Sequence, residues 1–109
     1  MRVLLKRPGQ VGVIGELNGY QEMHDFVGGF IETVRINRNT VIVCNDNFLN
    51  EDFSFNMGIA GTIFFGNIFL CGIDIVNSSG EWDLIGLTDE QLQTDLVRFI
   101  MGELQEVDI

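Results

Sequence analysis

Apolar positions at the start of the chain recur at every second residue, and turn residues interrupt them at short intervals. Over residues 2–6, Val3 and Leu5 alternate with Arg2, Leu4 and Lys6, which predicts a half-buried first strand. Arg7-Pro8-Gly9-Gln10 has the composition of a turn and ends this strand. A second strand is predicted over residues 11–17, so the chain begins with two strands joined by a short connection.

The period changes after residue 18, where apolar residues fall on one side of a short helix near residues 20–28. These apolar residues are Tyr20, Met23, Phe26 and Val27. Asn18-Gly19 either turns the chain or caps this helix. Gly28-Gly29 ends it, because glycine readily adopts the left-handed conformation that follows a helix C-terminus.

Two β-rich runs follow the helix, over residues 30–36 and 40–46. Asn37-Arg38-Asn39 separates them, which predicts a hairpin. In the second run, Val41 and Val43 point to one side while Ile42 and Cys44 point to the other. A strand that is apolar on both sides is expected at the middle of a sheet.

The next segment, residues 45–61, is polar and aromatic without a clean period, and we expect a packed loop or a short helix there. Further strands are predicted over residues 62–65 and 68–75. Gly66-Asn67 between them has the composition of a hairpin turn, and Asn77-Ser78-Ser79-Gly80 is another turn.

The last helix is predicted from its capping box, Thr88-Asp89-Glu90-Gln91, and extends over residues 89–104. Its apolar stripe is wide enough to lie on the sheet or on a partner subunit. The stripe contains Leu92, Leu96, Val97, Ile100, Met101 and Leu104. The predicted class is therefore α+β, with a mainly antiparallel sheet of five or six strands and one or two helices on a face.

Several of these features occur in an order that resembles a known family. Gly28-Gly29, the two β-rich runs and the polar Asn45-Asp46-Asn47 turn are preceded by Arg7-Pro8-Gly9 and followed by Asn56 and Gly61-Thr62. Their order and spacing resemble a small family found mostly in phages and mobile elements, catalogued as domain of unknown function 3846. The resemblance covers roughly residues 1–100 and implies a phage or mobile-element protein without naming its chemistry.

Length and composition predict one domain over residues 1–109, because 109 residues with 46% hydrophobic content bury a core without disulfide or metal staples. Cys44 and Cys71 lie in apolar runs and are expected to be buried thiols. No apolar run approaches the roughly 18 residues that span a bilayer, and residues 1–7 are too charged for a secretory signal. We therefore expect a cytoplasmic location in the host cell and no membrane partner.

The net charge of −10 is unevenly distributed. Residues 1–38 carry five Lys or Arg and four carboxylates, whereas residues 39–109 carry one Arg and twelve carboxylates, with an acidic tail from about residue 103. This balance indicates either a solubilising acidic surface or a bipolar molecule with one weakly basic region. It disfavours direct nucleic-acid binding, which requires a basic surface.

Catalytic residues are not predicted. His24 is the only histidine, so a His-rich metal site is excluded and a nucleophilic triad would have to use this residue. No local motif supports His24 as a base for Cys44, and packing or capping is the simpler interpretation of this histidine. The sequence therefore predicts a non-enzymatic protein.

Two motifs that suggest a metal or a nucleotide fail on spacing. The run over residues 45–52 is rich in oxygen ligands, but two apolar residues interrupt the EF-hand alternation and its glycine is missing. Gly9, Gly12 and Gly15 lack the strand-to-helix loop and the lysine of a phosphate loop, and indicate bulges or close packing more than a backbone-lined anion site. We predict no metal and no cofactor.

Glu32 is unusual because alternation places it between Phe30 and Val34 on the more apolar side of its strand. A carboxylate in that position needs a partner. Two interpretations stay open: an edge or interface position where Glu32 pairs with an arginine, or a carboxylate that lines a pocket and has a raised pKa.

The phage resemblance implies a counter-defence protein that works by binding, and in the most concrete form it sequesters a nucleotide-like immune signal in a pocket built by a homo-oligomer. Arginines would bind phosphate, while asparagines and aromatic side chains would contact bases or sugars. The candidate ligand-binding residues are Arg7, Glu32, Arg35, Arg38, Asn45, Asp46, Asn56 and Thr62.

The charge favours a different function. In this alternative, the acidic surface from residue 46 onward occupies a cationic surface of a host defence or nucleic-acid enzyme. A structural or accessory role in the mobile element is a second alternative. Self-association through the terminal apolar stripe or an edge strand is expected under the first hypothesis, because it builds the shared pocket.

Overall fold

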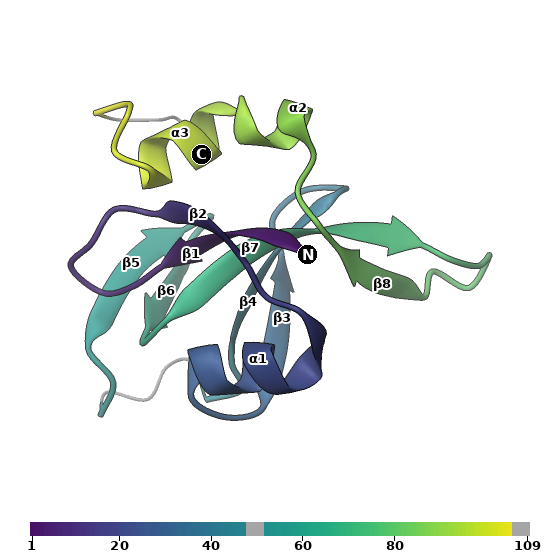
Figure 1. Cartoon of the computed structure of the whole chain (residues 1–109), viewed down its shortest axis with the longest axis horizontal. Helices are drawn as coiled ribbons and strands as arrows, with labels where there is room; N and C mark the ends of the chain where they lie inside the picture. Colours follow the sequence, from purple (N-terminus) through teal and green to yellow (C-terminus); the bar gives the residue numbers. More distant parts are fainter. Residues whose placement is uncertain (48–51, 106–109) are drawn as a thin grey trace.

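The computed structural model describes residues 1–47 and 52–105. A six-stranded antiparallel sheet occupies its middle and separates two groups of covering elements (Figure 1). The strands of this sheet are β1 (Arg2–Lys6), β2 (Val13–Glu16), β3 (Ile31–Arg35), β4 (Thr40–Asn45), β7 (Ile68–Ile75) and β8 (Trp82–Ile85). The predicted α+β class with a mainly antiparallel sheet is confirmed.

The central strand is β7, the longest of the chain, and the strand order is β2-β1-β7-β4-β3. Gly72 pairs with Thr40 of β4 on one edge of β7 and with Ile85 of β8 on the other. Strand β8 therefore continues the edge that β1 occupies at the other end of β7. The prediction that β4 is covered on both sides is confirmed, since all six of its residues are buried between β3 and β7.

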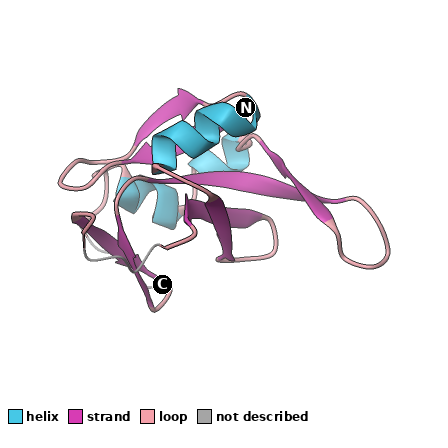
Figure 2. Ribbon diagram, turned by 90° about the horizontal axis from the view of Figure 1, so that it is seen from below, coloured by secondary structure: helices cyan, strands magenta, loops and turns pink. Residues whose placement is uncertain are grey.

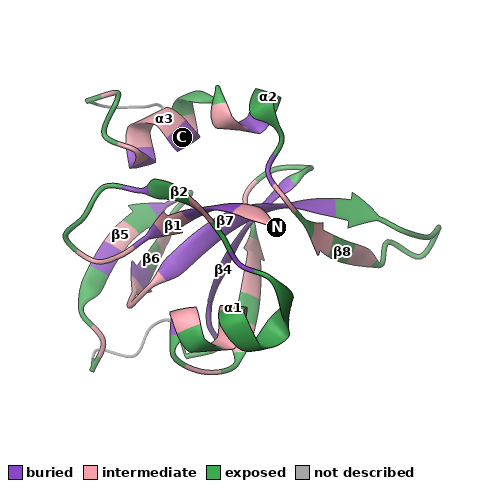
Figure 3. Cartoon of the chain, viewed as in Figure 1, coloured by how far each residue is buried: buried purple, intermediate pink, exposed green. Residues whose placement is uncertain are grey.

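Each face of the sheet has its own hydrophobic core (Figure 3). On one face, α1 (Gly19–Val27) packs through Met23, Phe26 and Val27. The other face is covered by α2 (Asp89–Leu92), α3 (Asp95–Ile100) and a separate two-stranded sheet of β5 (Phe55–Ile59) and β6 (Thr62–Phe65). Because both faces are covered, adjacent residues of β1, Val3 and Leu4, are both fully buried, and the prediction of a half-buried first strand is wrong.

Local signals were accurate where one short segment decides the structure. The turn at 37–39 joins β3 to β4 as predicted, with Ile31 opposite Asn45 and Arg35 opposite Val41. Gly28 follows α1 with a φ of 83°, the left-handed conformation expected at a helix C-terminus. The second strand is shorter than predicted, because only Val13–Glu16 pairs with β1.

Strand pairing after residue 52 differs from the prediction. Strand β6 does not form a hairpin with β7; it pairs with β5, which lies in the segment expected to be a loop or helix. Ala60 and Gly61, with φ values of 51° and 81°, provide the two left-handed residues that a tight hairpin turn needs. The part of the predicted loop at 48–51 lies outside the described residues.

The C-terminal region also differs in detail. The capping box is confirmed, since the Thr88 side chain and the Gln91 side chain each accept the other's backbone N–H. The single helix predicted over 89–104 is instead two short helices, with Gln93 as the C-cap of the first and Thr94 as the N-cap of the second. Val97 and Ile100 are buried against the sheet of the same chain, so the apolar stripe packs intramolecularly. Of the acidic tail, residues 106–109 lie outside the described part.

Candidate functional site

Two of the candidate ligand-binding residues, Asn45 and Asn56, form hydrogen bonds to backbone groups. Asn45 Nδ2 lies 3.3 Å from the Val27 carbonyl oxygen at the end of α1, and its Oδ1 accepts the Asn47 N–H at 2.9 Å. Asn56 Nδ2 donates to the carbonyl oxygens of Lys6 and Gly66 at 2.8 and 2.7 Å. Both side chains are buried and fasten the helix and the β5–β6 hairpin to the sheet.

Arg7 lies at the same end of the sheet, just after β1. Its guanidinium carbon is 5.0 Å from the centre of the Phe26 ring, within range of a cation–π contact. Beside it, Lys6 is 7% exposed, and its Nζ donates to Asn56 Oδ1 and to the Arg7 carbonyl oxygen, both at 2.9 Å. Burial lowers the pKa of Lys6, because removal of water penalises the ammonium.

Arg35 and Arg38 lie at the opposite end of β4. Arg35 donates to the carbonyl oxygens of Asn37 and Arg38 at 2.9 and 2.7 Å and so fixes the β3–β4 turn. With six residues, β4 is about 17 Å long at about 3.4 Å per residue, and the ladder register places Arg7 level with its other end. One chain therefore does not place Arg7 beside Arg35 and Arg38.

The other candidate ligand-binding residues are also dispersed. Glu32 is exposed on the edge strand β3, on the same side as Cys44, and its carboxylate accepts the Thr33 N–H at 3.0 Å. Among the described residues, no arginine lies within ion-pair distance of Glu32. Asp46 is exposed after β4, and Thr62 begins β6 opposite Ile59. The sequence-predicted residues thus occupy several surfaces of one chain.

Cys44 and the histidine lie on opposite faces of the sheet. Cys44 packs in the core on the face covered by α2, α3 and the β5–β6 hairpin, whereas His24 belongs to α1 on the other face, between the rings of Tyr20 and Phe30. Burial raises the pKa of Cys44 and of Cys71 to about 12, so neither is a thiolate at neutral pH. Over residues 1–47 and 52–105, no group of three His, Cys, Asp or Glu side chains is arranged to hold a metal.

The most distinctive surface is one that the sequence did not single out, the hairpin formed by the end of β7 and by β8. We call residues 74–83 the acidic arm. It extends beyond the rest of the molecule in both views (Figures 1 and 2). Its ladder pairs Asp74 with Asp83 and Ile75 with Trp82, and a backbone hydrogen bond of 2.8 Å joins Val76 to Glu81.

The arm has one acidic and one apolar side. Because side chains alternate along a strand, Asp74 and Asp83 share a side with Glu81, whereas Ile75 and Trp82 point to the opposite side. No Lys or Arg occurs between residues 74 and 83. In the described part of the chain, no cation forms an ion pair with these three carboxylates.

Asn77 shapes the tip of the arm. Its Oδ1 accepts the N–H groups of Ser79 and Glu81 at 3.0 and 3.2 Å, and the Ser79 hydroxyl at 2.8 Å. Its Nδ2 donates to Glu81 Oε2 at 2.8 Å. Gly80 has a φ of 86°, which lets the chain reverse. These contacts give the exposed tip a defined conformation.

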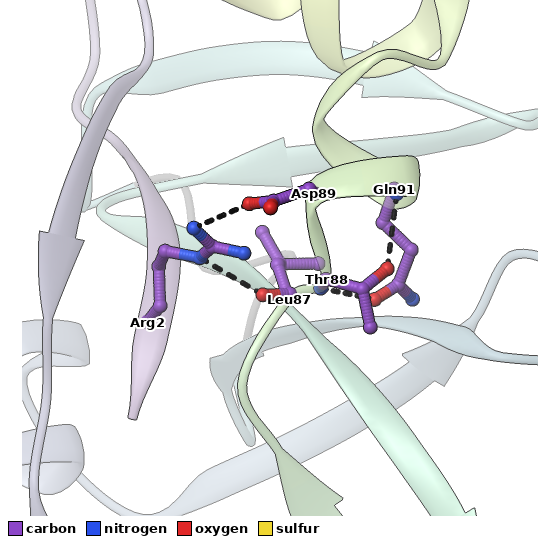
Figure 4. Close-up of polar contacts among 5 residues, drawn as sticks. All are labelled: Arg2, Leu87, Thr88, Asp89 and Gln91. Atoms are coloured by element: carbon purple, nitrogen blue, oxygen red, sulfur yellow. Dashed lines mark hydrogen bonds and ion pairs between the residues drawn. The ribbon is translucent and has the colours of Figure 1, made fainter.

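The base of the arm is anchored by a polar cluster (Figure 4). Arg2 donates from Nε to the Leu87 carbonyl oxygen at 2.9 Å and forms a 2.9 Å ion pair with Asp89. The buried Gln91 donates from Nε2 to the Asn39 carbonyl oxygen and to Thr40 Oγ1, at 2.9 and 3.0 Å. The first strand, the β3–β4 turn and α2 thus meet where the arm leaves the sheet.

Comparison with known proteins gives one match. The family described as Domain of unknown function (DUF3846) matches residues 1–100 of the 109-residue chain. The chain belongs to this family. No curated protein and no solved structure matches the chain.

The DUF3846 match covers the sheet, α1 to α3 and the whole acidic arm. None of the described helices is both long and apolar enough to cross a membrane. The arm of this DUF3846 domain had a sequence signal: Trp82 and Leu84 alternate with Asp83 and Ile85 after a clear turn, which is typical of a second hairpin strand. Its exposure had no such signal, because it depends on β7 being longer than its neighbours.

Proposed function

We propose that this DUF3846 protein is a non-enzymatic binding protein whose acidic arm occupies a cationic surface of another protein. The observation that carries the proposal is the direct opposition of Asp74 and Asp83 across the arm, without a neutralising cation in the described structure. Like charges in this position are unfavourable for the free protein. A cationic partner reduces that repulsion, and its positive groups are attracted to the carboxylates of the arm.

The arm has the physical properties such a partner requires. Its carboxylates are exposed, so they attract a basic surface over about 8 Å at physiological ionic strength and raise the association rate. Val76, which alternation places on the same side as these carboxylates, is 51% exposed and adds short-range apolar contact beside the charges. The resemblance to phage proteins motivates the specific target that we propose, a host defence or nucleic-acid enzyme with a basic binding surface.

A second candidate function has its own supporting observation. In a chain with sixteen carboxylates, Arg7, Arg35 and Arg38 have no ion-pair partner among the described residues. Unpaired cations favour anion binding, so sequestration of a nucleotide-like immune signal is retained as the alternative. These cations lie at two ends of the sheet, so a compact ligand would contact cations from both ends only in a pocket that two copies of the chain build together.

The test compares two variants with equal charge. The arm variant carries Asp74→Asn, Glu81→Gln and Asp83→Asn, and the control carries Glu16→Gln, Asp46→Asn and Asp95→Asn, at exposed carboxylates elsewhere. Immobilised wild type and both variants are exposed to host lysate, and retained proteins are identified by quantitative mass spectrometry. We expect a basic protein to bind wild type and control but not the arm variant.

The interaction is then measured with the purified partner by calorimetry. We expect affinity to fall at least about tenfold between about 50 and about 500 mM NaCl, because salt screens charge attraction. If the wild type and the arm variant retain the basic protein equally, the arm is not its binding surface. Binding of a cyclic dinucleotide that is lost in an Arg35→Ala, Arg38→Ala variant would instead support the alternative.

A further inference from the structure

The β5–β6 hairpin is a second exposed surface with opposite chemistry. From Phe53 to Ile73 the sequence contains no charged residue, although the chain carries a net charge of −10. The inner side of the hairpin contributes Ile59 and Phe64 to the core, where both are buried. On its outer side, Phe55 and Ile63 are 57% and 52% exposed.

The outer side is apolar and has a defined shape. The rings of Phe55 and Phe65 meet edge to face, with centroids 5.8 Å apart. Next to them, Ile63 lies opposite Gly58 in the ladder, and a side-chain atom at Gly58 would meet only the Thr62 carbonyl oxygen, at 3.7 Å. The surface therefore presents a projecting Ile63 beside an open position at Gly58.

We propose that this surface binds the same surface of a second copy of the chain. A projection and a recess that lie side by side are self-complementary under a two-fold axis, so Ile63 of each copy packs over Gly58 of the other. The charge distribution favours this occupant. Two chains of charge −10 repel each other, and contact through an uncharged surface keeps their carboxylates apart. A cationic partner gains no charge attraction there.

The size of the hairpin gives a second reason. In the described structure, β5 and β6 form a sheet of two strands whose inner side packs in the core through Ile59 and Phe64, while Phe55 and Ile63 on its outer side are exposed. Small sheets gain stability from further packing, and a neighbouring copy supplies apolar contact on the outer side. The terminal apolar stripe does not serve this purpose, because it packs on its own sheet.

The proposal is independent of the acidic arm and predicts the opposite response to salt. Screening weakens the repulsion between two acidic chains, so self-association strengthens as NaCl is raised, whereas binding of a cationic partner weakens. Sedimentation velocity of the wild-type chain over a concentration series, at about 50 and about 500 mM NaCl, measures this directly. We expect a dimer whose dissociation constant falls with salt.

Three variants locate the interface. Ile63→Asp introduces a charge into the surface and should raise the dimer dissociation constant at least about tenfold. Ile75→Asp makes the same change at a similarly exposed position of the arm and should leave the dimer intact. Gly58→Val fills the recess without a charge and should also dissociate the dimer, with circular dichroism confirming that each variant folds.

Two results would overturn the proposal. The first is a wild-type chain that stays monomeric at every concentration and salt. The second is a dimer that Ile63→Asp and Gly58→Val leave intact, or that Ile75→Asp weakens equally.

Discussion

Two hairpins of this chain differ in almost every physical property. The β5–β6 hairpin carries no charge and inserts Ile59 and Phe64 into the core. The acidic arm carries three carboxylates, and none of its residues is buried. Both present exposed apolar side chains, so exposure alone does not tell them apart. Charge does tell them apart, and it is the reason we propose partners of different chemistry for the two surfaces.

The two hairpins also differ in how they are attached to the main sheet. The arm is an extension of β7, whose residues 68–73 are buried, with β4 along one edge and β1 and then β8 along the other. The β5–β6 hairpin has no ladder to the main sheet and depends on side chains, notably Phe64 and the amide of Asn56. We therefore expect the arm to be insensitive to substitution at its outer half, and the β5–β6 hairpin to depend on a few buried groups.

The largest expected difference is in the accessibility of thiols placed in the buried half of β7 and on the arm. In a Cys44→Ala background, Cys71 reports the buried half of the strand, and a Val76→Cys substitution reports the arm. A thiol reagent should modify position 76 at least about a thousandfold faster than Cys71, because Cys71 becomes accessible only on global unfolding. Absorbance-monitored labelling at neutral pH gives both rates. Comparable rates would show that the centre of the sheet opens locally.

The same thiols predict how stability changes at alkaline pH. Folding raises the pKa of Cys44 and Cys71 from 9.0 to about 12, so the unfolded chain ionises first as pH rises. The stability that this shift contributes is complete below pH 9 and declines above it. A Cys44→Ala, Cys71→Ala variant should lose less stability than wild type between neutral and alkaline pH in urea unfolding.

A smaller contrast separates the two hairpins by packing. Phe64→Ala should reduce the free energy of unfolding by about 3–5 kcal/mol, because it leaves a cavity beneath the β5–β6 hairpin. Ile75→Ala in the arm removes an exposed side chain and should change it by less than about 0.5 kcal/mol. Urea denaturation followed by circular dichroism measures both. A cost above this limit for Ile75→Ala would mean that the arm is part of the cooperative core.

The smallest effect tests repulsion within the arm. Asp74→Asn should stabilise the protein by about 0.2–1 kcal/mol at low salt, because it removes the like charge opposite Asp83. Asp46→Asn makes the same change at an exposed position outside the strands and serves as the control. The gain should shrink as salt is added. Thermal unfolding that shows the same change for both variants would argue against a specific Asp74–Asp83 repulsion.

The elements predicted correctly are those whose determinants lie within a few residues. The capping box joins Thr88 to Gln91, and the β3–β4 hairpin needs only a three-residue turn. The β5–β6 pairing was missed because Gly66-Asn67 has a turn-like composition, while the actual turn uses Ala60, which seldom takes a positive φ. Strand pairing here depends on which of two possible turns forms, Ala60-Gly61 or Gly66-Asn67, and composition alone does not decide between them.

The candidate site was predicted less well than the fold, for a similar reason. Asn45 and Asn56 were chosen for their polarity, but the groups that they satisfy, the carbonyl oxygens of Val27 and Gly66, come from other segments. Arg35 was chosen as a phosphate ligand, and the structure shows it donating to its own turn. Which polar groups stay free for a ligand is decided by tertiary contacts.

The continuity of β7 has a thermodynamic consequence for recognition. One strand runs from the buried centre of the sheet, where Phe69 and Leu70 are inaccessible, to Ile75 on the arm without a hinge. A loop of the same length would lose about 1–2 kcal/mol of backbone conformational entropy for every residue that binding immobilises. The arm has already lost this entropy during folding. In the binding that we propose, its contacts therefore contribute to affinity without a backbone ordering penalty at the moment of encounter.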